Sequence, residues 1–599
     1  MRVRSEQLPF NVTPLSLRFA SFLTLAILTA GGTAPGQTAP AGKSAEQVAL
    51  QRGQEAIKNG DLGRARTEFE KAVRLAPNDA QAQSALGWAL EQQGELDAAV
   101  LHLKVAIKAK PDFADARLTL AGVLARQGKE AEAEQEARAA VKAAPGNAEP
   151  HRVLGRMLSQ RGVPEEALGE MRLAVKLAPE RAELHDDLGS VLAQQNQNAA
   201  AEVEFKDALR LQANLEPAHF HLGVIYWQGK NLDAAVSELG KAVELAPQNA
   251  VAHDYLAKVF SAQARNADAL QELRKAATLK PDWFELQIEL GLACQRAADA
   301  ECAVAAFGEA VKLRPQDAEA YNDLGLALIQ KGDAESSVAK FKTAIQLKPE
   351  DGTLRGNLAI AYMQRSDFDA AVTELEAAIN LAPQNASLHY NLGLAYKLKD
   401  QLEQAVPEFQ KAIALQPDLA DAHYTLGVLY WQKGEFDQAA DELKKAIRGQ
   451  PNYAEAHYTL GTVFKQQGKL PEAAAELREA IRLQPDFAGA HTTLAAVLRQ
   501  SGDAAGAAEE AKAGARISAA SNSLQAATFA TNSGKRLLSV GDVEGAIAQF
   551  RSAIQSQPAY APAHYELGRA LNQKGEKDEA KKEFQRAEEL DPHLKAPGK

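Results

Sequence analysis

Nine of the twelve histidines recur at a regular interval, and this row of imidazoles is the pattern in the sequence that could do chemistry. The nine are His151, His185, His219, His253, His389, His423, His457, His491 and His564, mostly separated by 34 residues or a multiple of 34. Imidazole titrates near neutral pH and binds zinc, so such a row could serve as a pH-sensitive array or as a metal site. A zinc site needs three or four ligands that converge at about 2 Å. The interval of 34 residues comes from a repeated helical unit, described below, in which the equivalent helices of successive copies lie at least roughly 8–10 Å apart. We therefore expect the imidazoles to form a row rather than a cluster, and we predict no metal site.

The sequence offers no catalytic motif. It contains no G-x-x-x-x-G-K-[ST], no G-x-G-x-x-G after a strand, no H-E-x-x-H and no G-x-S-x-G. The repeat described below takes up nearly every segment and leaves no stretch of about 100 residues for a catalytic domain. We therefore predict that the protein is not an enzyme and that it uses no cofactor.

The chain has two cysteines, Cys294 and Cys302, and both fall in one repeat. A disulfide between them would suit an exported protein. Their positions, one expected to be buried and one more exposed, favour two separate thiols, with the buried one acting as a small apolar side chain. Two cysteines without a neighbouring histidine are too few ligands for zinc.

The elements that would position these residues are clearest in residues 454–487, AEAHYTLGTVFKQQGKLPEAAAELREAIRLQPDF. Leu460 and Phe464 stand four residues apart and predict one apolar stripe on a first helix, helix A. Gly468 ends that helix, because glycine adopts a left-handed backbone at little cost. Apolar residues at helical spacing between Gly468 and Pro485 predict a second helix, helix B, which the proline ends.

We count sixteen copies of this 34-residue unit. The positions of the unit are numbered 1 to 34, with Ala454 as position 1 of the copy quoted above. Position 20 is Ala in every copy except Ser337, and position 27 is Ala in every copy except Gly514. Position 32 is proline in most copies: Pro77, Pro111, Pro145, Pro179, Pro247, Pro281, Pro315, Pro349, Pro383, Pro417, Pro451, Pro485, Pro558 and Pro592. One such hairpin cannot bury its own apolar face, so each copy must stack on the next.

This order of small, large and helix-ending residues resembles the tetratricopeptide repeat over about nine tenths of the chain. The resemblance implies an all-α fold, namely a right-handed superhelical α-solenoid of stacked helix–turn–helix hairpins. In that family, position 4 carries a bulky residue that packs against the preceding repeat. The resemblance therefore makes the nine histidines interface residues, with a pH-sensitive array as an alternative.

The resemblance also indicates where a partner would bind, because in this family positions 2, 5, 9, 12 and 13 of helix A face a concave groove. Carried over to repeats 11 to 13, these positions give Tyr390, Lys397, Tyr424, Val428, Trp431, Tyr458 and Lys465. A smaller cluster in repeat 6 has Phe220 and Trp227. Aromatic side chains are good anchors for a bound protein or peptide segment. Packing between neighbouring repeats is the alternative interpretation of the same residues.

The start of the chain differs from the repeats. Residues 1–36 combine three arginines with an apolar run at residues 19–30 and a small-residue exit, which is typical of a secretory signal peptide. Cleavage would fall after Gly32 or Gly36. An uncleaved N-terminal anchor is the alternative, although the run is shorter than the about 20 apolar residues of a membrane span.

The remaining boundaries follow the repeat. We predict a flexible linker at residues 37–45, repeats 1 to 14 at residues 46–521, an insertion at residues 522–526, repeats 15 and 16 at residues 527–594, and a tail at residues 595–599. Repeat 14 is degenerate, with Ala519 in place of the proline. Its junction with repeat 15 is either a hinge or a slightly irregular but continuous stack.

The net charge of −11 argues against a nucleic acid as the main partner. We predict an exported, non-catalytic scaffold that binds protein or peptide partners in its groove, in an envelope or secretion-related assembly. Its location would be periplasmic or secreted, with membrane contact only if residues 19–30 stay as an anchor in the inner membrane. The alternatives are a membrane-anchored assembly factor, or a substrate-recruiting arm for a separately encoded enzyme. The second rests on resemblance, since long arrays of this kind precede the transferase domain of O-linked N-acetylglucosamine transferases.

Overall fold

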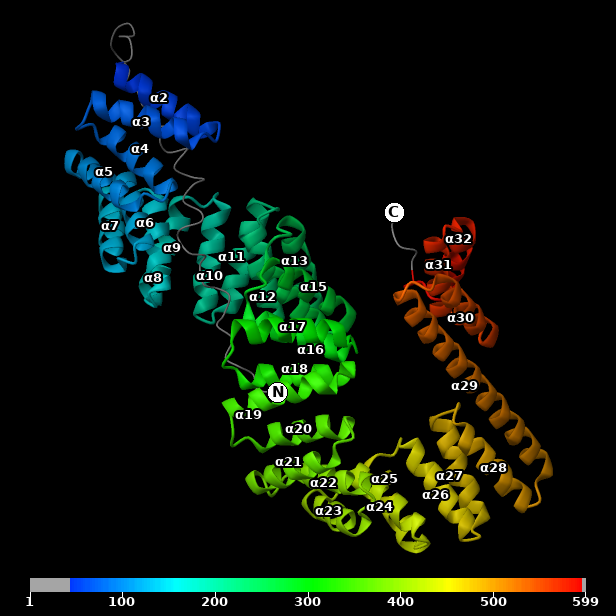
Figure 1. Cartoon of the computed structure of the whole chain (residues 1–599). Helices are drawn as coiled ribbons and strands as arrows, with labels where there is room; N and C mark the ends of the chain where they lie inside the picture. The colour runs from blue at the N-terminus through cyan, green and yellow to red at the C-terminus, as the bar shows by residue number, and fades with distance from the viewer. Residues whose placement is uncertain (1–43, 595–599) are drawn as a thin grey trace. The chain divides into compact units, whose positions relative to one another are not determined.

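The computed structural model describes residues 44–594, and within that range it contains helices and no strand. The predicted signal peptide, the tail and all but the last two residues of the predicted linker lie outside the described residues. The helices run in pairs, and nearly every pair spans one 34-residue repeat (Figure 1). The predicted all-α solenoid of stacked hairpins is therefore confirmed. None of the described helices is both long enough and apolar enough to cross a membrane.

The chain divides into two compact units, residues 1–315 and residues 316–599, and each is described by itself. The first unit contains α2 (Ala45–Lys58), α3 (Leu62–Leu75), α4 (Ala80–Gln92), α5 (Leu96–Ala109), α6 (Ala114–Arg126), α7 (Glu130–Ala143), α8 (Ala148–Gln160), α9 (Pro164–Leu177), α10 (Ala182–Gln194), α11 (Asn198–Leu211), α12 (Glu216–Gln228), α13 (Leu232–Leu245), α14 (Ala250–Ala262), α15 (Asn266–Leu279), α16 (Phe284–Arg296) and α17 (Ala300–Leu313). The second contains α18 (Ala318–Lys331), α19 (Ala334–Leu347), α20 (Gly352–Gln364), α21 (Phe368–Leu381), α22 (Ala386–Leu398), α23 (Leu402–Leu415), α24 (Ala420–Gln432), α25 (Phe436–Gly449), α26 (Ala454–Gln466), α27 (Leu470–Leu483), α28 (Ala488–Gln500), α29 (Ala504–Ser539), α30 (Val543–Ser556), α31 (Ala561–Lys574) and α32 (Lys577–Leu590).

Within each unit, the even-numbered helices up to α28 are the A helices of their repeats. Each A helix packs against the B helix that follows it, and that B helix packs against the next A helix. Most pairs of successive A helices also contact one another directly, as α8 does with α10 and α24 with α26. Side chains on equivalent faces of the A helices therefore form rows that run from repeat to repeat.

In most repeats the core forms where a large side chain of helix B crosses a small residue of helix A. Leu477 on α27 is fully buried, and a Cβ atom added to Gly461 on α26 would lie 2.8 Å from its Cγ. Phe409 on α23 is buried in the same way over Gly393 on α22, where the added Cβ would lie 2.8 Å from the ring. Carbon atoms in packed interiors approach to about 3.5–4.0 Å, so a residue larger than glycine would force the two helices apart.

The turn between helices A and B has a left-handed backbone at position 15 in all sixteen repeats. Ten repeats place glycine there, including Gly468 with φ of +74°. The other six use Asn196, Lys230, Ala264, Ala298, Ser366 and Asp400, with φ between +56° and +60°. A left-handed backbone costs an L-residue roughly 1–2 kcal/mol, so these six turns carry strain that glycine would relieve.

The junction between repeats 14 and 15 is a single helix. α29 has 36 residues, or about 54 Å at 1.5 Å per residue, and joins helix B of repeat 14 to helix A of repeat 15. The five predicted insertion residues, 522–526, lie inside it. Ala519 stands where other repeats have the helix-ending proline, and no glycine or proline lies between residues 515 and 526, so nothing in this stretch ends the helix. The long orange ribbon in Figure 1 is this helix.

Replacing Ala264 with glycine should stabilise repeat 7 by about 0.5–1 kcal/mol, because the relief of backbone strain exceeds the entropy that glycine adds to the unfolded chain. Hydrogen exchange of α14 and α15 measures this local stability. The matched control is Gly468→Ala, which should destabilise repeat 13 by about 1–2 kcal/mol. Faster exchange in the Ala264→Gly protein would contradict the assignment of strain to this turn.

Candidate functional site

Three tyrosines predicted to line the groove stand at the same position of three successive A helices. Tyr390 lies on α22, Tyr424 on α24 and Tyr458 on α26, and all three are half-buried. Because the equivalent faces of these helices form a row, the three rings follow one another along the stack. The structure therefore gives these predicted residues a common face.

Each tyrosine ring packs on a second aromatic ring. The Tyr424 ring lies 4.9 Å from that of Tyr453, and the Tyr458 ring lies 4.8 Å from that of Phe487, measured between ring centroids. The Tyr390 ring lies 5.7 Å from that of Phe409. These distances are typical of favourable aromatic pairs, so packing holds the three rings in place.

Polar contacts link the row from repeat to repeat. The Tyr453 hydroxyl donates a hydrogen bond of 3.3 Å to Asp421 Oδ1. Burial raises the pKa of Tyr390, and the charge of Asp421 in the next repeat adds to the rise, while a hydrogen bond with Thr425 opposes it. The groove positions of the repeat do not include Tyr453, so the sequence analysis did not assign it to this site. The aromatic residue at position 34, directly before helix A, was the signal that could have revealed Tyr453 and Phe487.

The other predicted groove residues of repeats 11 to 13 are half-buried as well: Lys397 on α22, Val428 and Trp431 on α24, and Lys465 on α26. Trp431 packs beside the apolar core of repeats 12 to 14. The arrangement combines aromatic rings that are fixed by packing with two ammonium groups. Such a surface can bind a protein or peptide segment through ring contacts and through ion pairs with its carboxylates.

Repeat 6 differs from this arrangement. Phe220 on α12 is only 7% exposed, and its ring meets the Tyr255 ring of the next repeat edge-on at 5.7 Å. Trp227 is half-buried and contacts the same Tyr255 ring at 5.6 Å. Phe220 is therefore placed for packing between repeats 6 and 7, and Trp227 is the more accessible of the two predicted residues.

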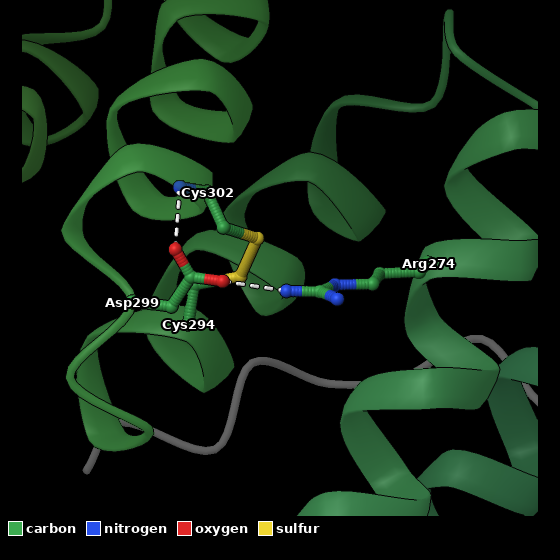
Figure 2. The surroundings of a disulfide bond; sticks show 4 residues. All are labelled: Arg274, Cys294, Asp299 and Cys302. Carbon is green, nitrogen blue, oxygen red and sulfur yellow. Dashed lines mark hydrogen bonds and ion pairs between the residues drawn. A yellow bond between two sulfur atoms is a disulfide. The ribbon is translucent and has the colours of Figure 1, made fainter. Parts of the chain in front are cut away.

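The two cysteines are bonded to each other, so the prediction of two separate thiols was wrong. Cys294 is fully buried on α16, and Cys302 lies in the first turn of α17, with 5.7 Å between their Cα atoms. The prediction failed because it treated the two positions as separate sites on two helices, whereas the hairpin turn brings them together. Figure 2 shows the bond beside Asp299, which accepts a hydrogen bond of 3.1 Å from the backbone N–H of Cys302 and one of 2.6 Å from Arg274 of α15.

Reducing this disulfide should lower the free energy of unfolding of repeat 8 by about 2–3 kcal/mol, the chain-entropy value for a loop this short. Thermal unfolding with and without dithiothreitol measures the effect. The Cys302→Ser protein is the control: it should start from the lower stability and show no response to the reductant. Equal stability of the oxidised and reduced wild type would show that the bond contributes nothing.

Within each unit, the histidines of consecutive repeats lie in a row, one per repeat, as their spacing predicts. Among the described residues, His185, Glu204 and Asp207 could bring three ligand atoms within 4.8 Å of one another. Two contacts already account for this group, because His185 Nδ1 lies 2.7 Å from Glu204 Oε2 and Asp207 forms an ion pair with Arg210. The His–Glu contact recurs in all nine repeats with histidine at position 4, so it needs no metal ion to explain it.

Family models agree with the repeat read from the sequence. Models described as tetratricopeptide repeat match residues 50–112, 187–250, 288–352 and 531–594, and a further one matches residues 90–157. A model described as TPR repeat matches residues 360–400, 397–434, 430–468 and 461–502. The chain belongs to the tetratricopeptide repeat family. Such arrays are scaffolds suited to binding proteins or peptides, and members of this fold are typically non-catalytic.

Solved structures that resemble this tetratricopeptide repeat protein include the APC/C hetero-tetramer Cut9–Hcn1, with 14% identity, a TM-score of 0.35 and coverage of 76% of this chain and 97% of that chain. Yeast Tom70 has 17% identity, a TM-score of 0.36 and coverage of 76% and 96%. YrrB, described as a TPR protein with an unusual peptide-binding site, has 24% identity, a TM-score of 0.26 and coverage of 31% and 97%. At these TM-scores the likeness carries no argument about function. No curated protein sequence matches the chain.

Proposed function

We propose that this tetratricopeptide repeat protein is an exported, non-catalytic scaffold that holds a protein or peptide segment along its A helices in repeats 11 to 13. The observation that carries the proposal is the row of Tyr390, Tyr424 and Tyr458, whose rings are held by packing and remain partly exposed. Side chains that are ordered before binding lose little conformational entropy when a partner arrives, so they make effective anchors.

The two lysines indicate which chemical groups a partner would carry. Lys397 and Lys465 stand at position 12 of repeats 11 and 13, on the helices that carry Tyr390 and Tyr458. A bound segment with apolar or aromatic side chains and one or two carboxylates would match both kinds of group. The negative charge of the whole chain would disfavour other acidic partners that lack this local match.

Two features support export to an oxidising compartment such as the periplasm or the cell exterior. The Cys294–Cys302 disulfide is of the kind that persists where the environment is oxidising. The order of charge, apolar run and small residues in residues 1–36 is that of a signal peptide. A role in an envelope or secretion-related assembly follows from that location.

Substitutions of the lysine side chains predicted to face the groove should weaken partner binding without destabilising the repeats. A Lys397→Ala, Lys465→Ala protein should lose at least about tenfold in affinity for its partner, equal to about 1.4 kcal/mol. Affinity capture from source-cell envelopes, followed by titration of the captured partner, measures the loss. The matched control is Lys411→Ala, Lys581→Ala, which removes two exposed lysines from B helices. Equal binding by both variants would place the binding surface elsewhere.

The N-terminus of the mature protein tests the proposed location. Mass spectrometry of the protein isolated from its source cells should find a first residue near position 33 or 37, because a signal peptidase cuts after the small residues that follow the apolar run. A mature chain that retains residues 19–30 would replace the exported scaffold with one anchored to the inner membrane.

A further inference from the structure

The nine histidines of the row all make the same two contacts. Nδ1 of each lies 2.5–2.7 Å from the Oε2 atom of a glutamate 19 residues later, on helix B of the same repeat. Nε2 lies 2.9–3.2 Å from a backbone carbonyl oxygen six residues earlier, in the turn that follows the preceding B helix. Each imidazole thus connects one repeat to the next. We call these nine residues, with their nine glutamates, the histidine ladder.

The two contacts fix the number of protons that each pair holds. A carbonyl oxygen only accepts hydrogen bonds, so Nε2 must carry a proton. An ionised carboxylate also only accepts, so Nδ1 must carry a second proton, which makes the ring an imidazolium. A neutral ring beside a protonated glutamic acid would hold the same total. When the pair loses this proton, the Nδ1 lone pair faces the carboxylate and the contact becomes repulsive.

Arginine takes the place of histidine in two repeats, and its contacts support this proton count. Arg117 donates from Nη1 to Glu136 Oε2 at 2.6 Å and from Nε to the Pro111 carbonyl oxygen at 3.0 Å. These are the same two kinds of acceptor at the same sequence offsets. Arg355 makes the equivalent bond to Glu374 at 2.8 Å. A permanent cation therefore fits this site, as an imidazolium does.

Glutamine marks the contrasting case. Gln83 and Gln287 also stand at position 4, and each donates from Nε2 to the carbonyl oxygen of the preceding turn, at 2.6 and 3.2 Å. Glutamine supplies the contact between repeats but no charge. The sequence thus contains a permanent cation, a titratable cation and a neutral donor at one structural position.

From this geometry we infer that the histidine ladder is a pH-sensitive clamp, which holds successive repeats together when protonated and loosens them when the protons leave. Two blocks of four consecutive repeats carry it, His151 to His253 in the first unit and His389 to His491 in the second. The second block includes repeats 11 to 13. This inference is independent of the proposed partner site, since it rests on the contacts between repeats alone.

Other charged side chains lie close to the histidine–glutamate pairs of the ladder. His457 faces Glu476 and Glu479 of α27, and Arg482 binds Glu479. His564 faces Glu583 and Arg586 of α32. In three other repeats a lysine of helix B binds the second oxygen of the same glutamate: Lys241 with Glu238, Lys275 with Glu272, and Lys445 with Glu442. Asp207 lies close to the His185–Glu204 pair.

These surroundings set the direction of the pH effect. The hydrogen bond to Glu476 raises the pKa of His457 above its usual 6.5, and the one to Glu583 does the same for His564. A raised pKa in the folded state gives stability that is full below about pH 6.5 and is lost as pH rises through the raised value. Burial works to raise the pKa of Glu442, but bonds from His423 and Lys445 lower it below 4.5, so that pair weakens again in stronger acid. The clamp is therefore tightest between about pH 4.5 and 6.5.

Hydrogen exchange of the full-length protein between pH 6 and 8.5, corrected for intrinsic exchange rates, tests this inference. Protection of α22, α24, α26 and α28 should fall at least about tenfold more than that of α16, α18 and α20, because loss of the Nδ1 proton turns each histidine–glutamate contact from a charge-assisted hydrogen bond into a repulsive one. The second set is an internal control, since Gln287, Tyr321 and Arg355 stand at position 4 of those helices. Equal losses in the two sets would overturn the inference.

Two variants separate the clamp from ordinary packing. In the His389→Arg, His423→Arg, His457→Arg, His491→Arg protein, protection in repeats 11 to 14 should stay high across the pH range, as the Arg117 contacts predict. In the His457→Gln protein, repeat 13 should show the low protection of the deprotonated state at both pH 6 and pH 8.5. A pH response in the arginine variant as large as that of the wild type would refute the clamp. If that variant does not fold, the comparison within the wild type decides.

Discussion

Every feature of this protein depends on the close approach of two helices that are too short to fold alone. A 34-residue hairpin gains its core from one large side chain of helix B laid on a glycine or alanine of helix A, as Leu477 is on Gly461. The rest of its apolar surface is covered by the neighbouring repeat. Stability is therefore a sum of contacts within repeats and between neighbours, and a change at one interface acts locally. This explains how turns with strained residues such as Ala264 persist inside a well-packed stack.

The repeat itself could be predicted almost completely from the sequence, because its determinants are local. Small residues at fixed positions, a glycine in the turn and a proline after helix B each act within a few residues of themselves. The contacts that were missed join residues from different helices. Cys294 and Cys302 were predicted to be separate thiols, although the turn between them brings their Cα atoms to 5.7 Å, a separation that suits a disulfide. The repeat length shows which residues are equivalent from copy to copy, but it does not show which residues are in contact.

The histidine row shows the same limit more sharply. Its spacing correctly indicated a row, and the resemblance to the family indicated an interface. The protonation of each imidazole depends on two acceptors, a glutamate 19 residues later and a carbonyl oxygen six residues earlier. A search for acidic residues at a fixed offset from each histidine would have found the glutamates. A backbone carbonyl belongs to every residue type, so no residue search reveals it, and it is this acceptor that requires a proton on Nε2 in addition to the proton that faces the glutamate.

The groove residues fall between these cases. The sequence placed Tyr390, Tyr424 and Tyr458 on one face, but it offered packing and binding as competing interpretations. In the structure each ring packs on a second aromatic ring and stays partly exposed, so the two interpretations are compatible in a single side chain. Truncating such a ring would remove an interface contact together with a binding contact, and the loss of a partner would then be ambiguous. Binding and stability would separate more cleanly at half-buried charged groups such as Lys397 and Lys465, which are predicted to face the groove. For a scaffold built from neighbour contacts, the tips of the side chains are the part of the surface that evolution can change for a partner without changing the stack.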